Sequence, residues 1–79
     1  MNRDDAIEDH LAQVLNYLLK KRGDHGEYHL ISYSSSGTGT VAKFASESGK
    51  GVSAINPMSR YPLTDPPNRN WWLATHSRV

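Results

Sequence analysis

The amphipathic pattern of the first third of the chain constrains the fold more than any other feature. Apolar side chains recur there at steps of three and four residues, which at about 100° per residue places them on one face of a helix. Polar side chains occupy the opposite face. The pattern therefore predicts a helix over about residues 3–22. Its apolar stripe comprises Ile7, Leu11, Val14, Leu15 and Leu18, and its polar face comprises Asp5, Asp9, Gln13, Asn16 and Lys20.

Both ends of this segment carry residues that start and stop helices. Asn2 is a favoured N-cap residue, and the acidic residues after it complement the positive end of the helix dipole. Three basic residues complement the negative end, and Gly23 can adopt the left-handed conformation that ends a helix. Start, stop and periodicity agree, so we expect a helix with one buried face.

The rest of the chain is typical of short strands separated by turns. Alternation directs Phe44 toward the helix and Lys43 toward solvent. In the first strand it places Tyr28 and Tyr33 on different faces, so neither face is cleanly polar. Gly49 can take the positive φ of a tight hairpin. The four predicted strands cover about residues 27–34, 40–46, 51–55 and 71–75.

These elements predict an α+β fold in one domain, residues 1–79. One N-terminal amphipathic helix packs on one face of a three- to four-stranded antiparallel sheet, whose first strands form a meander. We expect the apolar stripe to pack on Phe44, Ile55 and one of two adjacent tryptophans. The second sheet face keeps Val41, the other tryptophan, and one or both of Tyr28 and Tyr33. So much aromatic surface on a wet face indicates a partner or a dimer contact.

The tryptophan pair is the most unusual feature of the later half. Adjacent residues of a strand point to opposite faces, so one of Trp71 and Trp72 should enter the core. The other is then a surface anchor, since Trp is enriched at binding hot spots. In the alternative, both indoles are covered by the loop over about residues 56–70, which holds all four prolines. Loops of this length are usually functional or disordered.

No pattern in the chain predicts catalysis or metal binding. The Ser/Gly/Thr segment 34–40 has neither the lysine nor the following helix of a phosphate-binding loop, so it is interpreted as a hairpin loop. There is no cysteine and no nucleophile elbow. His25, Glu27 and His29 straddle a turn and a strand start, where their spacing aligns nothing. We therefore expect no enzyme, no catalytic residue, no cofactor and no metal, and we expect His10 to be a half-buried packing residue.

Charge is distributed unevenly along the chain. Residues 1–29 hold four Lys/Arg and six Asp/Glu, whereas residues 30–79 hold five and two, giving net charges of −2 and +3. The basic later half suits an acidic partner, but it lacks the dense basic stripe of a strong polyanion binder. The residues expected to bind a partner are Arg60, Tyr61, Arg69, Trp71, Trp72 and Lys43.

The expected function is that of a small non-enzymatic protein-interaction module, an inhibitor or adaptor of the kind found in phages and mobile elements. The alternative is weak binding of single-stranded or structured nucleic acid by the basic later half and its aromatic residues. A chain of 79 residues without disulfides has a small core, so homodimerisation is also expected. No apolar run reaches the ~18 residues of a membrane span, and no signal peptide is evident, so we expect a soluble cytoplasmic protein.

Overall fold

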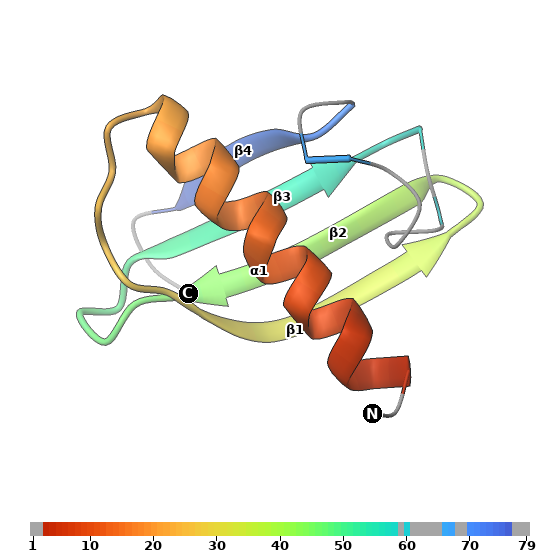
Figure 1. Ribbon diagram of the computed structural model, residues 1–79, viewed down its shortest axis with the longest axis horizontal. Coiled ribbons are helices and arrows are strands. Elements are labelled where there is room, and N and C mark those ends of the chain that lie inside the picture. The colour runs from red at the N-terminus through yellow and green to blue at the C-terminus, as the bar shows by residue number, and fades with distance from the viewer. Residues whose placement is uncertain (1–2, 59, 61–65, 68–69, 77–79) are drawn as a thin grey trace.

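One helix lies across one face of a four-stranded antiparallel sheet in the computed structural model (Figure 1). The structure describes residues 3–58, 60, 66–67 and 70–76. Sheet order follows sequence order, β1-β2-β3-β4, with every neighbouring pair antiparallel. This arrangement confirms the predicted α+β fold. The elements are α1 (Arg3–Lys21), β1 (His29–Ser36), β2 (Gly39–Ala45), β3 (Gly51–Asn56) and β4 (Trp72–His76).

Helix α1 ends where the sequence predicts, through a left-handed glycine. Gly23 has φ 72°, and its N–H donates to the Lys20 carbonyl at 3.1 Å. The Asp24 N–H donates to the Leu19 carbonyl at 3.0 Å. These two bonds form a Schellman motif, which pairs carbonyls that the helix itself leaves unsatisfied. The predicted N-cap, Asn2, lies outside the described residues.

The core lies between α1 and the sheet face that it covers. Cross-strand pairing puts Phe44 opposite Val52 and Ala54 opposite Leu73, so these side chains share the helix-facing side. The prediction that Ile55 joins this core is wrong. Ile55 pairs with Val41, and this register places it on the other face. The buried cluster comprises Ile7, Leu11, Val14, Leu15, Leu18, Leu19, Ala42, Phe44, Val52, Ala54, Trp71 and Leu73.

A bulge in β1 overturns the predicted placement of the tyrosines. Leu30 pairs with Phe44 and Tyr33 pairs with Ala42, so Ile31 is an extra residue between them. The extra residue lets Leu30 and Tyr33 point to the same, helix-facing side although they are three positions apart. Tyr28 and Tyr33 both pack against the core cluster. Neither tyrosine therefore contributes to the second sheet face, contrary to the prediction.

Two glycines set the ends of the hairpins. Gly49 has φ 89°, as predicted for the turn in which Ser46 N–H donates to the Lys50 carbonyl at 2.9 Å. Gly39 has φ 113°, and a Cβ there would overlap the Asn56 carbonyl oxygen. β2 and β3 thus approach each other at this point more closely than a side chain would permit. Within the part of the chain that the structure describes, no helix is long and apolar enough to cross a membrane.

Candidate interaction surface

The sheet face turned away from α1 carries a row of apolar side chains that crosses the strands. Val41 on β2 pairs with Ile55 on β3, and Ile55 pairs with Trp72 on β4. Directly paired residues project from the same face, so these three side chains lie side by side. We call them the apolar row. Ser34 on β1 pairs with Val41, so the line of paired residues continues from the apolar row onto β1. Trp72 is 51% exposed, and Val41 and Ile55 are half-buried.

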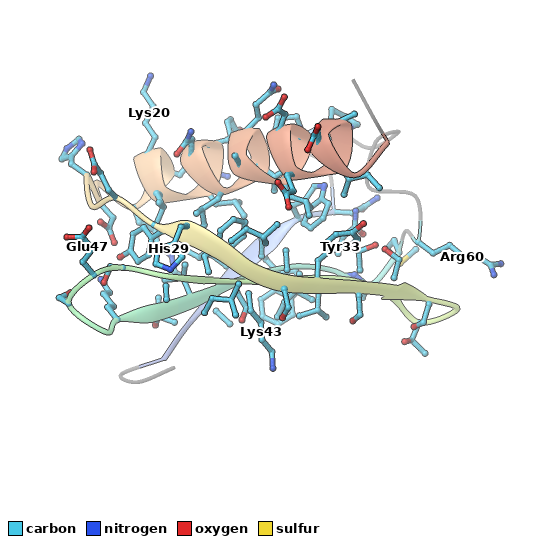
Figure 2. All side chains as sticks on the ribbon, turned by 90° about the horizontal axis from the view of Figure 1, so that it is seen from below. Lys20, His29, Tyr33, Lys43, Glu47 and Arg60 are labelled. Carbon is cyan, nitrogen blue, oxygen red and sulfur yellow. The ribbon has the colours of Figure 1, made fainter. Side chains whose placement is uncertain are left out.

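Lys43 stands beside the apolar row on the same face. It is exposed, and Figure 2 shows its side chain pointing away from α1 on the far side of the sheet. The register pairs Lys43 with Ser53, and Ser53 with Ala74, in the next row on this face. From strand spacings, Lys43 and Trp72 lie roughly 12 Å apart between Cα atoms. The strand residues on this face, as far as the structure describes them, include no carboxylate.

The two tryptophans separate as strand alternation predicts. Trp71 precedes β4, is 7% exposed and belongs to the core cluster, whereas Trp72 projects from the other face. Trp71 was also predicted to bind a partner, and the structure places its indole in the core cluster instead of on the outer sheet face. Its Nε1 is buried and has no hydrogen-bond partner among the described residues. Trp72 alone of the pair is available as an anchor.

The remaining predicted site residues do not join Lys43 and Trp72 in the described structure. Arg60 is exposed, and Figure 2 shows it beyond the end of the sheet, well apart from Lys43. Tyr61 and Arg69 lie outside the described residues. Of the three basic residues predicted to bind a partner, Lys43 is the one on a described strand.

Ile55 is the surface residue that the sequence interpretation missed. Its segment reads Gly-Val-Ser-Ala-Ile-Asn, in which both alternating sets contain an apolar residue. Pairing with β2 decides between them, because Val52 must face the same side as Phe44. Val52 and Phe44 are both buried under α1, and Ile55 falls on the opposite parity. Combining the direction of Phe44 with the hairpin register would have found it.

A charged cluster at the other end of the molecule fixes the helix end to the sheet. Asp24 accepts hydrogen bonds from the Gly26 N–H at 2.8 Å, the Tyr28 hydroxyl at 3.0 Å and the Lys50 ammonium at 3.2 Å. The Gly26 bond, followed by those from Tyr28 and Lys50, lowers the pKa of Asp24. The hydrogen bond to Asp24 raises the pKa of Lys50. Lys50 is half exposed, so this ion pair is partly screened by solvent.

A depression of about 470 Å³ adjoins this cluster. Glu27 and His29 line it from the start of β1, and Glu47 lines it from the β2–β3 hairpin. Figure 2 places His29 and Glu47 at this end of the sheet, remote from Arg60. Residues 3–58, 60, 66–67 and 70–76 contain no group of three His, Asp or Glu side chains able to hold a metal ion. The depression lies between the linker that follows α1 and the β2–β3 hairpin.

Comparisons of the chain with protein-family models, curated proteins and solved structures found no match. What the protein binds must therefore be inferred from the chemistry of its own surface. Among the described residues, the apolar row with Lys43 is a part of that surface whose composition the fold does not explain.

Proposed function

We propose that the chain is a non-enzymatic protein-interaction module, of inhibitor or adaptor type, whose helix-free sheet face binds another protein. The observation that supports this proposal is the half-exposed Trp72 at the end of the apolar row. A solvated face of an antiparallel sheet is normally polar, and this one is interrupted by three adjacent large apolar residues. Contiguous apolar surface on a small protein is a mark of an interaction site.

The residue composition of this face resembles that of interfaces between proteins. Trp supplies a large rigid contact area with only two side-chain torsions to order, and the β-branched Val41 and Ile55 are stiff already. Ser34 and Lys43 form a polar margin beside these residues. An apolar centre with a polar rim is the usual composition of an interface between proteins.

The apolar row is also separate from the residues that hold the fold. Neither Val41, Ile55 nor Trp72 belongs to the core cluster under α1. The row therefore lies outside the packing between α1 and the sheet. A module of this kind can change its partner surface while keeping its core.

Nucleic-acid binding is the second candidate, because Lys43 and Trp72 share one face. Single-strand binding combines base stacking on aromatic side chains with several phosphate contacts. On this face the described strand residues bring together one tryptophan and one lysine, which is little for a phosphate-driven complex. Titration of a labelled oligonucleotide at about 50 mM salt tests it, since such binding is strongest at low salt. Absence of binding there would exclude this candidate.

Site-specific photo-crosslinking in the native host cell tests the proposed function. A photoreactive phenylalanine analogue replaces Trp72 in one variant and Lys20 in a matched control. Lys20 is exposed on α1 and points away from the sheet (Figure 2). We expect a discrete light-dependent protein adduct from position 72 and none of the same mass from position 20. Equal labelling from both positions, or no adduct from position 72, would contradict the proposal.

A further inference from the structure

The direction of the apolar row restricts what can cover it. Along each strand of the helix-free face, apolar residues alternate with polar or small ones, as Val41 does with Lys43 and Ile55 with Ser53. Across the strands, by contrast, three apolar residues are consecutive neighbours. An extended peptide lying along a strand would meet one large apolar residue and then a polar position. An occupant that lies across the strands would meet the whole row.

The spacing of the row matches the spacing of turns on a helix. Neighbouring strands are about 4.8 Å apart, so the row from Ser34 to Trp72 measures about 14 Å. On a helix, residues three or four positions apart rise by about 4.5–6 Å, and about 10 residues span the row. Successive turns of a helix laid across the strands would then place one apolar residue over each successive strand.

The same sheet already binds a helix in this way on its other face. Helix α1 crosses the strands and contacts β1, β3 and β4 (Figure 1). Its stripe at steps of three and four residues packs on small and medium-sized side chains such as Ala54 and Val52. The covered face therefore demonstrates a packing geometry that the second face can repeat with a partner's helix.

The charge of the face complements acidic groups. Lys43 is exposed beside the row, and the described strand residues on this face carry no carboxylate. A second copy stacked through the same face would offer Lys43 no carboxylate from its described strand residues. The area of the sheet face, taken as four strands of five residues each, is at most about 300 Å². A stable interface between globular partners usually buries about 800 Å² on each side.

We infer that the occupant of the helix-free face is an acidic amphipathic helix of a partner protein, laid across the strands with its apolar stripe on Val41, Ile55 and Trp72 and a carboxylate near Lys43. This inference rests on the proposed function and adds the conformation and charge of the partner segment. A three-layer arrangement results, with the sheet between two helices.

Selection from a displayed peptide library tests the inference with the full chain as bait. The library holds random peptides of about 16 residues, and a Trp72→Ser chain removes peptides that bind elsewhere. We expect enriched peptides to be net acidic, with apolar residues at steps of three and four. Their affinity should fall about 30-fold or more for Trp72→Ala, the loss typical of a hot-spot residue. Lys43→Glu should weaken them and Lys20→Glu should not.

Other outcomes identify other occupants and overturn the inference. Enriched peptides that are basic, that alternate apolar and polar residues, or that tolerate a central proline would show that the segment is not an acidic helix. In that case photo-crosslinking at position 72 still yields a protein adduct, and the proposed function stands. Failure to enrich any peptide over the Trp72→Ser bait overturns the inference. So does oligonucleotide binding, or self-association that Trp72→Ala abolishes.

Discussion

Truncation of Leu15 tests whether α1 covers the sheet as described. Leu15 is 3% exposed and lies in the core cluster, so its side chain loses nearly all contact with water on folding. Leu15→Ala removes three carbon atoms, worth about 0.8 kcal/mol each in transfer free energy, or about 2.4 kcal/mol together. A residual cavity of about 40 Å³ adds about 1 kcal/mol. The expected loss of unfolding free energy is about 3 kcal/mol.

That loss is comparable with the whole stability of so small a domain. A single core below about 80 residues rarely supplies more than about 3–5 kcal/mol. Leu15→Ala should therefore largely unfold the protein, and any folded remainder should melt about 12–24 °C lower, at about 4–8 °C per kcal/mol. Asp9→Ala is the matched control, because Asp9 is exposed on the same helix. It should change stability by no more than about 0.5 kcal/mol.

Urea denaturation at 25 °C, followed by far-ultraviolet circular dichroism, measures both variants. A Leu15→Ala loss below about 1 kcal/mol would refute the reasoning, since a buried leucine cannot be removed so cheaply. The stripe of α1 would then not be packed on the sheet. It would become a better candidate for the partner surface than the apolar row.

Three further predictions concern the backbone, the charged cluster and assembly. Gly39→Ala should cost at least about 2 kcal/mol in urea denaturation, because its φ is 113° and an added Cβ meets the Asn56 carbonyl. Gly37→Ala, with open space around the added atom, should be nearly neutral. Asp24→Asn should lower the melting temperature at pH 7. Because folding lowers the pKa of Asp24, the Asp24 carboxylate stabilises the folded state fully above the ordinary pKa of 3.8. This stabilisation is lost as the pH falls through the lower pKa of the folded state. The melting temperatures of wild type and variant should therefore converge in strong acid. Convergence already at pH 5 would contradict this. Sedimentation at micromolar concentration should show a homodimer, formed by pairing an exposed sheet edge with the same edge of a second copy. A species near 8.8 kDa alone would contradict that expectation.

The fold was predictable from the sequence because its local signals agree. Each of three signals is compatible with one local structure: the apolar stripe of α1, the glycine that follows it, and the alternation in β2. The observed bounds fall within one or two residues of those predicted. Phe44 faces the helix and Lys43 faces away, as alternation required. Where a segment has one clearly apolar face, the period of two is enough to orient it.

The interaction surface was only partly predictable, because two of its strands have no such face. In β1 an inserted residue changes the parity between Leu30 and Tyr33, and no local signal marks a bulge there. In β3 the short sequence is apolar on both sides, so only the register with Phe44 decides that Val52 is inside. The bulge in β1 turns the tyrosines away from the helix-free face. The register of β3 places Ile55 on that face, opposite to the predicted side.

The bulge and the register together explain why the second face has its present composition. With Leu30 and Tyr33 both directed toward α1, the core is completed by residues of the covered face and needs nothing from the other one. Stability alone would be served at Val41 and Ile55 by threonine, which suits a solvated strand equally well and exposes less apolar surface. Trp72 at the edge strand is a poorer choice still for a protein that only has to stay folded and soluble, because exposed apolar edges promote aggregation. Large apolar residues on a solvated sheet face do not stabilise the fold, and they are expected where a surface contacts a partner. The apolar row is the place in the described structure where that condition is met on three neighbouring strands at once.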